Sequence, residues 1–75
     1  MFINITIESG EHSRDIRIDS EQKIKEAISI LRRSGKLPMG STPDYLGSMI
    51  NQKLVSAHKT FVEEGVYDGD KLSIV

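Results

Sequence analysis

The 75-residue sequence contains no cysteine and no tryptophan, and its ten lysines and arginines nearly balance its eleven aspartates and glutamates. The absence of cysteine excludes disulfides, thiolate metal sites and cysteine nucleophiles, and it is typical of a reducing compartment, so we expect a cytoplasmic protein. The net charge of -1 provides no overall field that would attract nucleic acid or anionic lipid. We therefore expect a protein partner and no nucleic acid.

Long apolar runs are missing as well. No stretch approaches the roughly 20 apolar residues that a membrane-spanning helix needs, so we expect no transmembrane segment. Residues 1–7 alternate apolar and polar side chains instead of placing a basic leader before an apolar run, which indicates a strand and not a signal peptide. With 37% hydrophobic and 28% charged residues, we expect residues 1–75 to form a single folded domain.

Two alternating runs open the chain. Ile3, Ile5 and Ile7 share one parity, which is the period of a strand with one buried face. Residues 9–13 are short, polar or glycine, and the next run offers Ile16 and Ile18 to the same side. This arrangement predicts a β-hairpin with its isoleucines in the core.

The pattern then changes to helical spacing. Cap-type residues at 19–22 precede a stripe of apolar residues three and four positions apart, formed by Ile24, Ala27, Ile28 and Leu31. Ser34 and Gly35 provide a stop. The sequence predicts an amphipathic helix from about residue 23 to residue 33.

Both prolines lie within residues 36–44, a density that predicts a long loop. Short strands are predicted at 45–50, 54–57 and 71–75, the last with Leu72 and Ile74 buried. Between them Thr60 and Glu63 have the spacing of a capping box, which predicts one helical turn. The order ββαββ, short turn, β predicts an α+β fold of the β-grasp type, with one helix packed across one face of a mixed sheet of four to five strands.

The parity of Ile3 and Ile5, the helix stripe and the tail from residue 60 onward together resemble the layout of ubiquitin over essentially the whole chain. Residues 65–74 have the spacing Gly-Val-x-x-Gly-Asp-x-Leu-x-Ile, which resembles the YukD/EsaB group of small ubiquitin-like proteins associated with bacterial type VII secretion. This resemblance implies a non-covalent accessory or regulatory protein of that apparatus. The implied partner is a protein, with a membrane-associated secretion component as one candidate.

The end of the sequence bears on this function. Conjugation and sulfur-carrier chemistry in this superfamily need a flexible tail ending in Gly-Gly, and the sequence ends at Val75 instead. We therefore favour non-covalent binding without catalysis. Two alternatives stay open: a covalent modifier or sulfur carrier whose Gly-Gly tail is missing here, and a regulatory or adaptor domain cut from a longer chain.

The predicted contact surface is the open face of the sheet, with the loop 36–44 as the other candidate. Ser48 and Ser73 are predicted at two positions where ubiquitin's binding patch has apolar residues, and Val75 keeps the apolar character of the third. If the register around Gly47 shifts by one residue, Met49 is the outward residue instead of Ser48. Generic ubiquitin-binding domains are therefore not expected as partners. Phe2, Tyr45 and Tyr67 are either interface anchors or caps on the ends of the core. The predicted protein-binding residues are Phe2, Asn4, Thr6, Ser48, Ser73 and Val75.

Other candidate sites have simpler explanations. His12 and His58 lack the accompanying ligands of a zinc site, and Asp68 with Asp70 is too small a ligand set for calcium. The basic residues of the helix alternate with glutamates and have no aromatic companions, so we interpret them as a solvated face. They are Lys23, Lys25, Arg32, Arg33 and Lys36. We expect no metal, no cofactor and no catalytic residue.

Overall fold

The N-terminal half of the sheet is a long hairpin in the computed structural model, which describes residues 1–74. β1 (Phe2–Ser9) and β2 (His12–Asp19) pair antiparallel, with Ile5 opposite Ile16. Gly10, in the turn between them, has a φ of 60°, a left-handed conformation that glycine adopts without steric cost. The predicted hairpin is confirmed.

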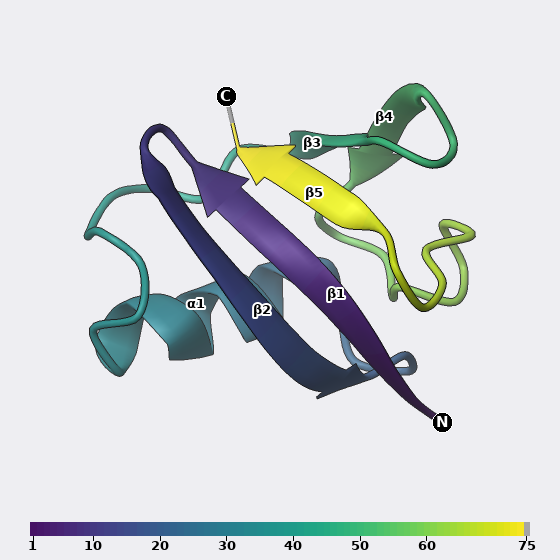
Figure 1. Cartoon of the computed structure of the whole chain (residues 1–75), viewed down its shortest axis with the longest axis horizontal. Coiled ribbons are helices and arrows are strands. Elements are labelled where there is room, and N and C mark those ends of the chain that lie inside the picture. Colours follow the sequence, from purple (N-terminus) through teal and green to yellow (C-terminus); the bar gives the residue numbers. More distant parts are fainter. Residues whose placement is uncertain (75) are drawn as a thin grey trace.

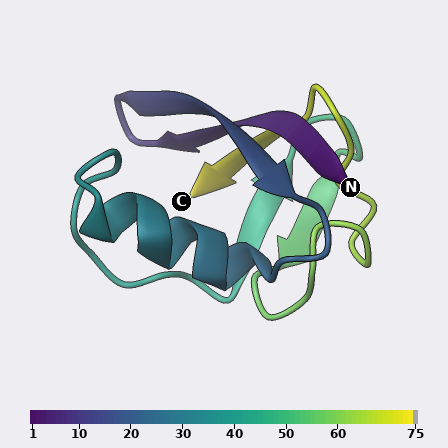
Figure 2. The ribbon, with the colours of Figure 1, turned by 90° about the horizontal axis from the view of Figure 1, so that it is seen from below.

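The helix α1 (Ile24–Arg33) lies across one face of the sheet (Figures 1 and 2). Its predicted apolar stripe is buried, and it ends at Ser34, whose hydroxyl donates to the carbonyl of Leu31 at 3.1 Å. Its N-cap, Lys23, makes no capping hydrogen bond. Instead the N–H groups of Ile24 and Lys25 donate to backbone carbonyls of residues 59 and 57, so distant chain segments satisfy the start of the helix.

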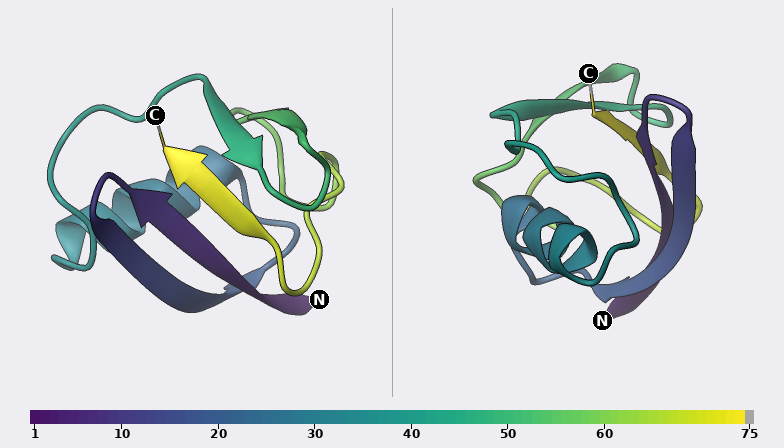
Figure 3. Two further views of the ribbon diagram at one scale, coloured as in Figure 1. Left: turned by 45° about the horizontal axis from the view of Figure 1, so that its top comes forward. Right: turned by 90° about the vertical axis from the view of Figure 1, so that its left-hand side faces the viewer.

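The second half of the sheet consists of β3 (Tyr45–Ser48), β4 (Lys53–Ser56) and β5 (Lys71–Ile74). The five strands lie in the order β2-β1-β5-β3-β4, with β5 parallel to β1 and antiparallel to β3 (Figures 1 and 3). This mixed sheet with one covering helix is the predicted β-grasp. All three short strands are present: β3 ends two residues earlier than expected, β4 begins and ends one residue earlier, and β5 begins where expected.

Two irregular segments close the core. Residues 34–44 contain no helix or strand, as predicted, and Leu37 within them is buried. In the turn after β4, Thr60 N–H donates to the Glu63 carboxylate at 2.9 Å, and Glu63 N–H donates to the Thr60 hydroxyl at 3.1 Å. The predicted capping box is therefore formed, but residues 61–65 make a hydrogen-bonded turn and no helix, and Phe61 within this turn is buried.

The core lies between α1 and the inner face of the sheet. Ile16 and Ile18 on the edge strand β2 are only partly buried, and so is Ile74 at the end of β5, where full burial was expected. Ile74 pairs with Ser9 at the last position of β1, so fewer neighbours surround it than surround Leu72. The fully covered apolar side chains are Ile3, Ile5, Ile7, Ile24, Ala27, Ile28, Leu31, Leu37, Leu46, Val55, Ala57, Phe61, Val66 and Leu72.

Candidate protein-binding surfaces

The outer face of the sheet is the side away from the helix. In β1, the even-numbered residues Phe2, Asn4 and Thr6 lie on it, because Ile3, Ile5 and Ile7 point into the core. Phe2 is 60% exposed, and the guanidinium carbon of Arg17 lies 5.4 Å from the centre of its ring. This contact holds an apolar ring on the surface in a defined position.

Hydrogen bonds organise the rest of this face. The Thr6 hydroxyl donates to the Asp15 carboxylate across the hairpin at 2.6 Å. Ser73 is half-buried on β5, where its hydroxyl lies 3.4 Å from a Glu8 carboxylate oxygen, and the Lys71 ammonium lies at the same distance from the other oxygen. The structure thus gathers four of the predicted binding residues, Phe2, Asn4, Thr6 and Ser73, on one face.

Ser48 does not belong to that surface, and its prediction as an outward residue was wrong. It is only 3% exposed, and its hydroxyl donates to the carboxylate of Asp70 at 2.6 Å. Leu46 and Ser48 share the inner parity of β3, so the residue that faces outward opposite Ser73 is Gly47. Val75, the remaining predicted residue, lies outside the described residues.

Asp70 is a buried carboxylate whose role the sequence did not reveal. It is 1% exposed and accepts hydrogen bonds from the Ser48 hydroxyl, from Ile50 N–H at 3.0 Å and from Lys71 N–H at 2.7 Å. The sequence suggested the same role, that of turn residues, for Asp68 and Asp70. In the structure the two differ: Asp70 links the start of β5 to the β3–β4 turn by hydrogen bonds, whereas the exposed Asp68 accepts a hydrogen bond from Asn4 N–H.

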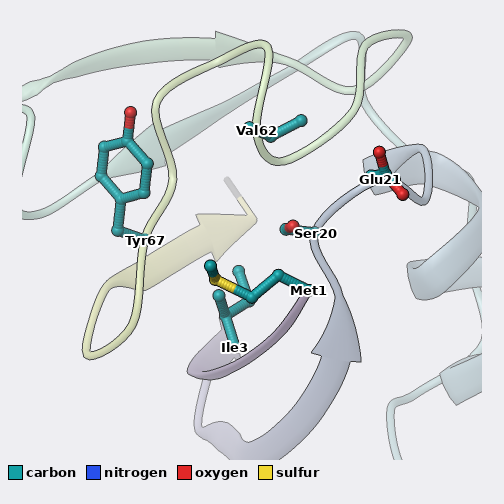
Figure 4. Close-up of a pocket in the computed structure, with 6 residues that line it drawn as sticks. All are labelled: Met1, Ile3, Ser20, Glu21, Val62 and Tyr67. Carbon is teal, nitrogen blue, oxygen red and sulfur yellow. The ribbon is translucent and has the colours of Figure 1, made fainter.

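An apolar pocket opens beside the N-terminal end of β1, with a volume of about 280 Å³. Figure 4 shows Tyr67 and Val62 on opposite sides of it and Met1 between them. Tyr67 is 61% exposed, so it does not cap the core. The residues that line the pocket come from the beginning of the chain and from positions 20, 21, 62 and 67. Because they are far apart in the sequence, no local sequence pattern predicts the pocket. Its lining consists of Met1, Ile3, Ser20, Glu21, Val62 and Tyr67.

The Asp19 carboxylate, close in sequence to the pocket residues Ser20 and Glu21, is stabilised by local hydrogen bonds. The backbone N–H of Glu21 donates to the Asp19 carboxylate at 3.0 Å, and the N-terminal amine lies 3.4 Å from the same oxygen. Both contacts favour the ionised carboxylate and lower the pKa of Asp19 below its ordinary value. Asp19, which precedes the pocket-lining Ser20 in the sequence, is therefore held in its ionised form.

A second apolar area lies on β3 and β4. Tyr45 is 58% exposed and Leu54 is 62% exposed. Both lie on the outer face, because Leu54 pairs directly with Gly47 and Tyr45 lies two residues before Gly47 on β3. All three aromatic residues that the sequence singled out, Phe2, Tyr45 and Tyr67, are thus available for contacts with another molecule.

His58 Nε2 lies 2.8 Å from the Asp44 carboxylate on the surface. Among residues 1–74, no group of three or more His, Cys, Asp or Glu side chains is arranged to hold a metal ion. Nor does the described part of the chain contain a helix with the length and apolar character needed to cross a membrane.

One helix residue departs from the predicted solvated face. Arg32, in the last turn of α1, is only 8% exposed, whereas its neighbour Arg33 is exposed. Its guanidinium lies against the backbone of Gly40, where an added Cβ would approach Nη1 to 3.1 Å. The loop 36–44 covers this arginine, which the sequence did not indicate.

Comparison with known proteins gives no match to any protein-family model or curated protein. Solved structures do match. The ubiquitin of Caldiarchaeum subterraneum aligns over 99% of this chain and 91% of its own, with a TM-score of 0.67 and 19% identity. The chain has the ubiquitin fold.

Two further matches come from ESX and Ecc proteins. The ubiquitin-like domain of EccD5 from Mycobacterium xenopi aligns over all of this chain and 93% of its own, with a TM-score of 0.61 and 17% identity. Protomer 1 of the ESX-3 core complex gives a TM-score of 0.62 and 20% identity, with 16% of that chain covered. At these identities the likeness establishes the ubiquitin-like fold alone.

Proposed function

We propose that this chain is a non-covalent protein-binding component of a bacterial type VII secretion system, acting in the cytoplasm in an accessory or regulatory role. The observation that carries the proposal is the match to the EccD5 domain, since the two chains superpose over all of this one and 93% of the other. Matches to protomer 1 of the ESX-3 core complex and to a chain of the ESX-5 inner membrane complex support the same proposal. The spacing of residues 65–74, which resembles the YukD/EsaB group, supports the finer assignment.

The physical basis for binding is the outer face of the sheet. Phe2, Tyr45 and Leu54 are each more than half exposed on this face. Large apolar side chains that the fold leaves in water are the residues that most often anchor protein interfaces. Asn4, Thr6 and Ser73 lie on the same face and add hydrogen-bonding groups, which suits a contact with a protein. We interpret the chain as a binding module without an enzymatic activity of its own.

The experiment is a calorimetric titration of the purified chain against the cytosolic region of a membrane component encoded beside it. The Phe2→Ala variant is expected to bind about tenfold or more weakly, as removal of an interface anchor usually does. Because Phe2 is exposed, its loss leaves the core intact, and far-ultraviolet circular dichroism is expected to be unchanged.

Ser29→Ala provides the matched control, since Ser29 lies on the exposed side of α1. It is expected to bind like the unaltered chain. Absence of binding to every component of the apparatus would contradict the proposed function. Equal binding by the Phe2→Ala variant would contradict only the assignment of the surface.

A further inference from the structure

Arg32 carries a buried charge that the described part of the chain does not balance. Its side chain is 8% exposed, and both Nε and Nη1 are buried without a hydrogen-bond partner among residues 1–74. A guanidinium stays protonated at every physiological pH, so the charge cannot be relieved by losing a proton. Burying such a group without an acceptor is unfavourable.

The two arginines of the β1–β2 hairpin, unlike Arg32 on the helix, both have a contact for the guanidinium. Arg14 Nε donates to the backbone carbonyl of Lys36 at 2.9 Å, and Arg17 lies over the ring of Phe2. The ion pairs between described residues use the carboxylates of Glu8, Asp19 and Asp44, and none of them reaches Arg32. Among residues 1–74, Arg32 therefore has two unused donor nitrogens and no ion-pair partner.

The segment that covers Arg32 is weakly attached. Residues 38–43 take part in no hydrogen bond with any other residue in the described range 1–74. The nearest attachments flank them: Leu37 N–H donates to the Leu31 carbonyl, and the Asp44 carbonyl accepts from Ala57 N–H at 2.8 Å. Moving these six residues breaks no hydrogen bond, and it uncovers the guanidinium beneath Gly40.

We propose that Arg32 anchors a site for a carboxylate side chain of the protein partner, reached when residues 38–43 move aside. A carboxylate supplies the acceptors that both buried nitrogens lack, and charge-assisted hydrogen bonds of this kind are strong. The unfavourable burial of the arginine is already present in the free chain, so pairing has to offset only the desolvation of the incoming carboxylate.

The same features argue against nucleic acid or a lipid surface as the ligand. Both are recognised through arrays of several exposed positive charges. Here a single guanidinium lies in a covered recess, on a chain with a net charge of -1. This inference depends on the proposed function only in taking the partner to be a protein.

The test is a nuclear magnetic resonance titration of the ¹⁵N-labelled chain with acetylated, amidated tetraglutamate at constant ionic strength. The Nε–Hε signal of Arg32 and the amide signals of residues 39–42 are expected to shift saturably. Tetraglutamine, which has the same backbone without the charge, is expected to produce no saturable shift. Inorganic phosphate serves as the competing anion.

Two neighbouring variants separate a specific site from surface charge. Arg32→Met keeps the aliphatic packing and is expected to weaken tetraglutamate binding about tenfold or more. Arg33→Gln removes an adjacent exposed charge and is expected to change the affinity less than about twofold. If Arg32→Met does not fold, Arg32→Lys keeps the charge without the planar fork and is expected to weaken binding as well.

Three results would overturn the site: no saturable shift at Arg32, tighter binding of phosphate than of tetraglutamate, or an equal loss of affinity in the Arg33→Gln variant. The calorimetric titration distinguishes this failure from failure of the proposed function. If the Arg32→Met chain still binds its membrane component as the unaltered chain does, the carboxylate site is wrong and the protein-binding function stands.

Discussion

Asp70 and Arg32 are both charged side chains buried at the edge of the same small core, and the chain treats them in opposite ways. Asp70 accepts three hydrogen bonds, one from a serine hydroxyl and two from backbone N–H groups. Arg32 has two buried nitrogens with no acceptor among residues 1–74. Removing a charge from water is unfavourable in either case, but only Asp70 is compensated by the fold. The difference separates a charge that holds the structure together from one that is available to a partner.

Asp70→Ala is expected to have the largest effect. It removes all three hydrogen bonds and leaves the Ser48 hydroxyl and the Ile50 N–H without their acceptor. The free energy of unfolding is expected to fall by about 3–5 kcal/mol, measured by urea denaturation. Leu72→Ala, a neutral truncation at a fully buried position, calibrates the loss of packing at about 2–5 kcal/mol. A loss below about 0.5 kcal/mol for Asp70→Ala would place that carboxylate in water.

Arg32→Met is expected to change the free energy of unfolding in the opposite direction from Asp70→Ala. It replaces an uncompensated buried charge with an apolar side chain that can fill much of the same space. Stability is expected to be unchanged or to rise by up to about 4 kcal/mol in the same denaturation experiment. A decrease of more than about 1 kcal/mol would mean that the guanidinium has a stabilising partner within the free chain, and the comparison with Asp70 would fail.

Ser48→Ala sharpens the comparison at the level of one side chain, whose hydroxyl donates to Asp70 and accepts from the backbone N–H and the Nδ2 of Asn51. The hydroxyl is the only side-chain donor to Asp70 among residues 1–74, and the two backbone donors stay in place without it. We expect a loss of about 1–3 kcal/mol by urea denaturation. Ser73→Ala, on the outer face, is the matched control and is expected to change stability by less than about 0.5 kcal/mol. Equal effects at the two serines would contradict the inward placement of Ser48.

Glu63 shows how little a similar carboxylate contributes when it is exposed. The backbone N–H of Thr60 donates to it, and this hydrogen bond lowers the pKa of Glu63 below its ordinary value of 4.5. Because the pKa is lower in the folded chain, the stabilisation is present above pH 4.5 and is lost as the pH falls through the lowered value. At pH 6 we expect the melting temperature of the unaltered chain to be slightly higher than that of the Glu63→Gln variant. At pH 2–3 we expect this difference to vanish.

Glu11→Gln is the control for that pH series, since Glu11 is exposed in the hairpin turn. Its melting temperature is expected to follow that of the unaltered chain at pH 6. If the melting temperature of the unaltered chain rose further above that of the Glu63→Gln variant as the pH fell, the assignment of the capping box would be contradicted.

The sequence predicted those parts of the fold that depend on regular periodicity. Alternation in β1 and three-to-four spacing in α1 place Ile5 and Ile28 in the core without ambiguity, because each pattern has many repeats. The short strand β3 has no such redundancy. Gly47 has no side chain to mark a face, so the parity of Ser48 could not be read and was assigned to the wrong side of the sheet.

The candidate sites were predictable to a smaller extent. The outward residues of β1 follow directly from strand parity, and three of them were correctly placed. The pocket at Tyr67 and the burial of Arg32 depend on contacts between segments far apart in sequence. Arg32 in particular has the sequence context of an ordinary residue near a helix end. Only the path of residues 36–44 over it turns a surface charge into a buried one.

Site-specific photo-crosslinking in the cells that make this protein tests the proposed secretion-related binding most directly. A benzophenone side chain at position 4, on the outer face, is expected to give an adduct with a membrane-associated component of the secretion apparatus, and the Arg32→Met change is expected to reduce its yield. The same probe at position 29, on the exposed side of α1, is expected to give none. A probe at position 4 that forms no adduct with any secretion component would contradict the account.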